Sequence, residues 1–75
     1  METIIVNAPM TGRVIEVLVS DGDIVSKGDL LLVVESMKME NEIFSQHEGR
    51  VVTVHVREMQ TLTEDDAMLE IEVEG

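Results

Sequence analysis

One lysine, flanked by two methionines, is the side chain in this 75-residue sequence best suited to chemistry. It is Lys38, within the run Glu35-Ser36-Met37-Lys38-Met39-Glu40. Lys27 is the only other lysine, so an enzyme could single out Lys38 by its ammonium and by the flexible apolar groups beside it. The run has two interpretations: an attachment point read by another protein, or a surface lysine between two core methionines.

Lys38 is a poor candidate for a catalytic nucleophile. A nucleophilic amine must lose its proton readily, which requires burial or nearby positive charge. Instead Glu35, Glu40 and Glu42 lie close in sequence and stabilise the ammonium. We therefore expect that the domain does not activate its own lysine and that a partner enzyme drives any acylation of Lys38. Lys27 is interpreted as an ordinary solvated turn residue.

The composition limits the classes of protein that the chain can belong to. Seventy-five residues predict a single domain over 1–75. A net charge of −11 opposes binding to nucleic acid, and no run of about 20 apolar residues is present to insert into a membrane. With no cysteine and no basic, apolar N-terminal segment, a cytoplasmic location is the expectation.

An internal repeat surrounds the lysine. Residues 12–35 align with residues 49–72 at an offset of 37, with eight identities in 24 positions: Gly12/Gly49, Arg13/Arg50, Val14/Val51, Val17/Val54, Val19/Val56, Asp29/Asp66, Leu32/Leu69 and Glu35/Glu72. Two similar halves predict approximate twofold symmetry, and Lys38 follows the end of the first half.

Alternating apolar and polar residues predict eight short strands and no helix. The expected strands are 4–7, 13–19, 24–25, 30–34, 39–45, 52–56, 61–62 and 69–73. The apolar run 30–34 predicts a strand covered on both faces, whereas 52–56 and 69–73 predict strands with one wet face. The alternation places Met68, just before the last strand, on the wet face with Glu70, Glu72 and Glu74. These strands indicate an all-β sandwich or flattened barrel. A helix beginning at Thr63, with acids in its first turn, is the competing local prediction.

Two turns distinguish the halves. Gly22 and Gly28 supply positive φ in the first half, but Met59 and Asp65 occupy their places in the second. Methionine tolerates that region poorly, so we expect the chain at Met59 either to depart from the symmetry or to carry strain. Residues 36–40 must also reverse the chain without glycine, asparagine or proline, which would cost about 1 to 3 kcal/mol at each central residue of a tight turn.

The motif around Lys38 closely resembles the biotinylation motif of biotin carboxyl carrier domains in the biotinyl (biotin–lipoyl attachment) family. The resemblance extends along the chain to Ala8-Pro9-Met10-Thr11-Gly12, to residues 19–25, to Lys27-Gly28-Asp29 and to Gly49-Arg50-Val51. Thr11 departs from the family's frequent proline. No insertion separates Asp21 from Val25, so the domain resembles the type that lacks a protruding thumb.

The resemblance implies a flattened eight-stranded barrel, or barrel-sandwich hybrid, with its lysine on an exposed hairpin. It implies that a biotin protein ligase attaches biotin to Lys38, and that Met37 and Met39 serve recognition or pack as apolar contacts, with Glu35, Ser36 and Glu40 completing the motif. Biotin would then carry a carboxyl group between the biotin carboxylase and carboxyltransferase sites of a biotin-dependent carboxylase or decarboxylase. Attachment would change the formal charge from −11 to −12. A free-standing small carrier is the expectation.

Other functions remain open at this stage. A lipoyl carrier domain would share the architecture with a different cofactor on the lysine. An unmodified adaptor module of the same fold is a second alternative, for which Lys38→Arg would leave function intact. No metal site is predicted, because His47 and His55 lack the paired spacing of zinc ligands, and Glu64-Asp65-Asp66 is interpreted as a solvated turn.

Overall fold

The computed structural model describes residues 1–74 and consists of eight β-strands joined by turns. The strands are β1 (Glu2–Asn7), β2 (Gly12–Val17), β3 (Ile24–Val25), β4 (Leu30–Ser36), β5 (Met39–Phe44), β6 (Gly49–Val54), β7 (Thr61–Leu62) and β8 (Ala67–Val73). All eight predicted strands are present, with ends that differ by up to three residues. Within residues 1–74, no helix is long and apolar enough to cross a membrane.

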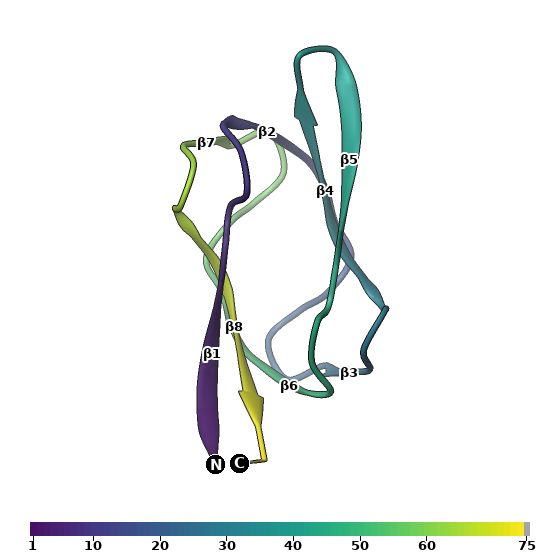
Figure 1. Ribbon diagram of the computed structural model, residues 1–75, viewed down its shortest axis with the longest axis vertical. Coiled ribbons are helices and arrows are strands. Elements are labelled where there is room, and N and C mark those ends of the chain that lie inside the picture. Colours follow the sequence, from purple (N-terminus) through teal and green to yellow (C-terminus); the bar gives the residue numbers. More distant parts are fainter. Residues whose placement is uncertain (75) are drawn as a thin grey trace.

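The strands form two four-stranded antiparallel sheets, ordered β1-β8-β6-β3 and β5-β4-β2-β7. Figure 1 shows the sheets as the two sides of an elongated molecule of 36 × 18 × 17 Å, with the β4–β5 hairpin at one end and both termini at the other. The sheets do not close into a true barrel. The predicted all-β flattened barrel is therefore confirmed in its sandwich-like form.

The core lies between the sheets and consists of aliphatic side chains. Fully buried members come from both halves: Val14, Leu31, Leu32, Val34, Val51, Leu62, Met68, Leu69 and Ile71. Each such side chain contributes about 1.5 to 3 kcal/mol when it leaves water. The central strand β4 is buried on both faces from Leu31 to Val34, as its uninterrupted apolar run predicts. The core thus holds rigid the strand that leads to Lys38.

The repeat extends further than the sequence identities indicate. At the same offset of 37, β1 corresponds to β5, β2 to β6, β3 to β7 and β4 to β8. Strands β1 and β5 share no identity along their length but have the same pattern of exposed and half-buried positions. The expected twofold symmetry therefore relates residues 2–36 to 39–73, and Met37 and Lys38 alone join the two repeats.

The turn residues keep this symmetry at the cost of backbone strain. Met59 has φ 72° opposite Gly22 at 94°, and Asp65 has φ 76° opposite Gly28 at 94°. The Met59 and Gly22 amides also make equivalent hydrogen bonds, to the carbonyls of Val14 and Val51. The expectation of strain at Met59 is confirmed, because a methionine occupies the left-handed region that costs about 1 to 2 kcal/mol for a residue with a Cβ.

The structure contradicts two predictions of which side chains face solvent and the alternative prediction of a helix. Met68, assigned to the wet face of its strand, is fully buried, because a bulge between β1 and β8 places consecutive residues inside. A second bulge, at Val52, makes Val51 the inward residue of β6 in place of the expected alternation from Val52. The alternative helix beginning at Thr63 is also wrong: its segment is a turn that leads into β8.

Candidate functional site

Lys38 lies at the tip of a tight hairpin between β4 and β5. Ser36 pairs with Met39, so only Met37 and Lys38 form the turn. Their φ angles are 54° and 67°. Positive φ at both central residues is the feature of the type I′ turn that matches the twist of hairpin strands, and it normally selects asparagine and glycine. The prediction of a strained reversal without those residues is confirmed.

The tip of the hairpin is open to solvent on all sides. Met37 is 92% exposed and Met39 is 67% exposed, and Lys38 is exposed as well. Two apolar side chains that leave most of their surface in water contribute little to folding, which contradicts the alternative in which both methionines belong to the core. The amine of Lys38 is therefore accessible for acylation, and a group attached to it would meet no obstruction from the fold.

The carboxylates of the motif lie below the tip, on the strands. Glu35 and Glu40 are directly opposite each other in β4 and β5, which places two like charges in one cross-strand pair. Arg13 on β2 lies on the other side of Glu35, 3.8 Å from its carboxylate. The base of the hairpin is therefore acidic, with one guanidinium at its edge.

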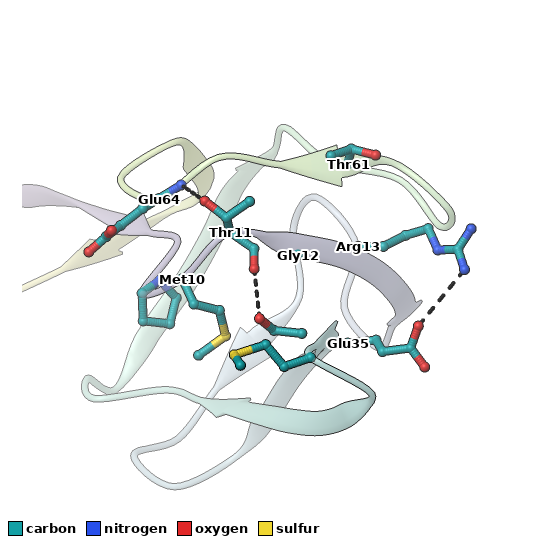
Figure 2. Close-up of a pocket in the computed structure, with 10 residues that line it drawn as sticks. Met10, Thr11, Gly12, Arg13, Glu35, Thr61 and Glu64 are labelled. Atoms are coloured by element: carbon teal, nitrogen blue, oxygen red, sulfur yellow. Dashed lines mark hydrogen bonds and ion pairs between the residues drawn. The ribbon is translucent and has the colours of Figure 1, made fainter.

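Side-chain hydrogen bonds fix the hairpin internally and to the rest of the fold. The Asn41 amide donates to the carbonyls of Met39 (3.2 Å) and Val34 (3.3 Å), which ties β5 to β4. The Ser36 hydroxyl donates to the Thr11 carbonyl at 2.8 Å, and the Thr11 hydroxyl accepts from the Glu64 amide at 3.1 Å. In Figure 2, dashed lines mark both hydrogen bonds of Thr11, one of them to the labelled Glu64. Three segments distant in sequence thus meet beside the hairpin.

A shallow depression adjoins the base of the hairpin. Its lining combines the apolar groups of Pro9, Met10 and Met37 with the polar groups of Arg13 and Glu64. The floor depends on Gly12, where an added Cβ would collide with the Glu35 carbonyl oxygen. The absence of a side chain at Gly12 therefore lets β2 approach β4 where the hairpin leaves the body of the domain.

The structure brings together every residue of the predicted motif. Glu35, Ser36, Met37, Lys38, Met39 and Glu40 all lie on the β4–β5 hairpin, within three residues of its tip. Sequence reasoning missed the supporting residues Asn41 and Arg13, and it noted Thr11 only as a departure from a family pattern. Asn41 lies one residue past the motif, but its part in the hairpin depends on strand register.

The two histidines lie away from the hairpin and contact different residues. His55, just after β6, contacts the carboxylate of Glu70 on β8 at 2.6 Å, and the His47 amide donates to the Ser45 hydroxyl at 3.2 Å. Over the described chain, residues 1–74, no three His, Cys, Asp or Glu side chains lie close enough together to hold a metal ion. The hairpin is therefore the candidate site that geometry and chemistry both indicate.

The amino-acid sequence is similar to known proteins over most of its length. Residues 5–71 match the biotin–lipoyl family model, described as "Biotin-requiring enzyme". Over 67 residues the chain is 48% identical to mitochondrial pyruvate carboxylase of Mus musculus, covering 89% of this chain and 6% of that protein. Over 64 residues it is 44% identical to the biotin carboxyl carrier protein of Streptococcus mutans, covering 85% of this chain and 49% of that protein.

Solved structures give the same result. A single-chain, multi-domain long-chain acyl-CoA carboxylase superposes with a TM-score of 0.89 at 28% identity, covering 96% of this chain and 7% of that one. The chain therefore spans about half the length of the carrier protein and a small part of the two carboxylases. The resemblance stated from the motif is confirmed at the level of family and fold.

Proposed function

Because the chain belongs to the biotin–lipoyl family, we propose that Lys38 is the residue to which biotin is covalently attached. The cofactor is biotin and the role is that of a carboxyl carrier, as in the carrier protein and carboxylases to which the chain is similar. The observation that carries the assignment is an exposed lysine at the tip of a two-residue turn in which both residues have positive φ. Residues 1–75 form one carrier domain in this proposal.

The hairpin suits attachment of a cofactor by an external enzyme. Its amine is exposed at the tip, and the charged side chains of the motif beside it, Glu35 and Glu40, are both acidic, so we assign activation of the biotin carboxyl group to a partner enzyme. A biotin protein ligase supplies an activated biotin carboxyl group, and the Lys38 ammonium loses one proton to become the attacking amine. An amide bond forms at Nζ as the activating group leaves and the nitrogen loses a second proton, so the formal charge changes from −11 to −12.

The two methionines give the ligase an apolar feature on each side of the lysine. Met37 and Met39 are the exposed apolar groups of the tip, and burying such a side chain in a partner contributes about 1.5 to 3 kcal/mol. Glu35 and Glu40 add negative charge just below, which favours a basic surface on the partner. In this proposal the ligase recognises the hairpin by the apolar side chains of the two methionines and the negative charge of the two glutamates.

Bound biotin supplies a ureido nitrogen that accepts and releases a carboxyl group. This chain contributes the tether and the rigid strand pair that presents it to a biotin carboxylase and a carboxyltransferase. A flexible tether on a small domain raises the effective concentration of the carried group at both sites. The domain itself is not catalytic in this proposal, because bond making belongs to the partners.

Coexpression with a biotin protein ligase tests the proposal. Streptavidin detects biotin on the wild type and on Lys27→Arg, whose lysine lies in the turn between β3 and β4, away from the hairpin (Figure 1). Lys38→Arg keeps the positive charge and is not labelled. Intact mass separates a biotinyl adduct from a lipoyl adduct. Equal labelling of wild type and Lys38→Arg would refute the assignment.

A further inference from the structure

The β4–β5 hairpin is joined to the body of the domain by a chain of two hydrogen bonds that the rest of the fold does not require. Ser36, the last residue of β4, donates from its hydroxyl to the Thr11 carbonyl at 2.8 Å. Thr11 in turn accepts at its hydroxyl from the Glu64 amide at 3.1 Å. We refer to Ser36, Thr11 and Glu64 as the clasp. It links the hairpin, the segment before β2 and the turn before β8 (Figure 2).

The internal symmetry provides a control for the clasp. The counterparts of Ser36, Thr11 and Glu64 in the other half are Val73, Glu48 and Lys27, respectively. Valine has no hydroxyl to donate, and in residues 1–74 no side-chain hydrogen bond joins the three counterpart positions. The strands there nevertheless have the same pairing as their equivalents at the lysine end. The fold therefore forms without a clasp, and the clasp is an addition specific to the end that carries Lys38.

A second asymmetry points the same way. The Asn41 amide donates one hydrogen bond to Val34 on β4 and one to Met39 within β5, and its counterpart on β1 is Ile4, which has no polar side chain. The hairpin projects from one end of the molecule with solvent around its tip, so few apolar contacts hold its direction (Figure 1). The polar hydrogen bonds at its base therefore restrict how the tip moves relative to the body of the domain.

We propose that Ser36 and Thr11 are positioning residues that orient the Met37–Lys38 turn for the enzyme that acylates Lys38. The inference rests on the proposed function of Lys38. It assigns Ser36 a role in presentation and not in contact with the acylating enzyme. An oriented tip is the form that the enzyme binds, and the apparent affinity for a protein falls in proportion to the fraction in that form. Loss of the clasp therefore acts on KM, because the acylation step on a correctly bound lysine is unchanged.

Steady-state biotinylation by a biotin protein ligase, with the full chain as variable substrate, measures this effect. Ser36→Ala is expected to raise KM by about threefold to tenfold, the ratio that corresponds to one lost hydrogen bond, with kcat unchanged. Ser36→Thr keeps a hydroxyl and restores KM. Thr11→Val removes the hydroxyl that accepts from Glu64, and its effect is not additive with that of Ser36→Ala, since both break one connected chain.

Ser26→Ala is the matched control, because Ser26 is an exposed serine in the turn between β3 and β4 whose amide, and not its hydroxyl, bonds to Asp29. This variant is expected to match wild type in KM and kcat. A KM for Ser36→Ala within twofold of wild type, or an increase that Ser36→Thr fails to reverse, overturns the proposal.

Amide order parameters separate failure of the clasp from failure of the proposed function. In Ser36→Ala the Met37 and Lys38 amides are expected to fall from rigid values toward about 0.6, while β4 amides do not change. This measurement needs no ligase, so it decides the clasp even if Lys38→Arg is labelled as well as wild type. Unchanged order parameters at Met37 and Lys38 would show that Ser36 does not restrain the turn.

Discussion

The two ends of the domain are built from the same repeat but present different residues. At one end β4 and β5 are joined by Met37 and Lys38, and at the other their counterparts β8 and β1 lead to the two termini (Figure 1). Most buried positions, the bulges and the turn hydrogen bonds match at an offset of 37. At the lysine end, three polar or charged residues take the place of apolar or uncharged ones: Ser36 for Val73, Asn41 for Ile4 and Glu40 for Thr3. The repeat supplies the sandwich, and a few polar substitutions distinguish the end that carries Lys38.

The close approach of strands at Gly12 and Gly49 is common to both ends and should give the largest effect on stability. An added Cβ would meet the carbonyl oxygen of Glu35 at Gly12 and that of Glu72 at Gly49. Gly12→Ala and Gly49→Ala are each expected to lower the free energy of unfolding by about 1 to 3 kcal/mol. Urea denaturation checks this, and a loss confined to one of the two variants would show that the ends are not structurally equivalent.

Strain in the left-handed region offers a smaller and more selective comparison. Met37→Gly and Met59→Gly both remove a Cβ from positive φ, and each is expected to stabilise the domain by about 1 kcal/mol. Only Met37→Gly should weaken biotinylation, because Met59 lies in a turn outside the hairpin. Thermal denaturation and ligase kinetics together test this. Equal biotinylation of the two variants would show that the ligase does not recognise the Met37 side chain.

The pair of glutamates at the base of the hairpin, Glu35 and Glu40, can be compared with Glu72 and Thr3 at the other end. The row Thr61, Arg13, Glu35 and Glu40 corresponds to Ile24, Arg50, Glu72 and Thr3 in the other sheet. Glu40→Thr copies the other end and removes the like-charge pair with Glu35. It is expected to stabilise the domain by about 0.5 kcal/mol at low salt, with the gain decreasing as salt is added. Loss of stability would show that Glu40 makes a favourable contact.

The two arginine pairs should give the smallest effect. Arg50 lies 3.1 Å from Glu72, and Arg13 lies 3.8 Å from Glu35, with both guanidinium groups about half exposed. Exposed pairs contribute little, so Arg50→Gln is expected to cost about 0.5 kcal/mol and Arg13→Gln less. Chemical denaturation of both variants in the same buffer tests the order. A larger loss for Arg13→Gln would contradict the looser geometry at the lysine end.

Sequence patterns predicted most of this fold because its constraints are local. Alternation and glycine-containing turns located all eight strands, and the identities at Gly12 and Gly49 revealed the repeat. The equivalence of β1 and β5 stayed hidden because edge strands need only a shared burial pattern, which different residues can supply. Met68 was misplaced because a bulge shifts the alternation, and a bulge depends on how two distant strands pair.

The motif around Lys38 was also predictable from the sequence, whereas the residues that hold the hairpin in place were not. Lys38 and its neighbours are contiguous, so their types and order are visible in the chain. Thr11 contributes a backbone carbonyl to Ser36, and every residue has one, so no residue type announces that role. The hydrogen bonds of Asn41 depend on the register of the hairpin. Contacts of this kind follow from tertiary geometry and require the structure.

Mapping the position of biotin by mass spectrometry tests the account most directly. The wild-type chain is coexpressed with a biotin protein ligase, digested and sequenced, and the fraction of modified lysine is measured at Lys27 and Lys38. All of the biotin is expected on Lys38, because that lysine alone lies between exposed methionines at the tip of a strained hairpin. Biotin on Lys27, or divided evenly between the two lysines, would contradict the account.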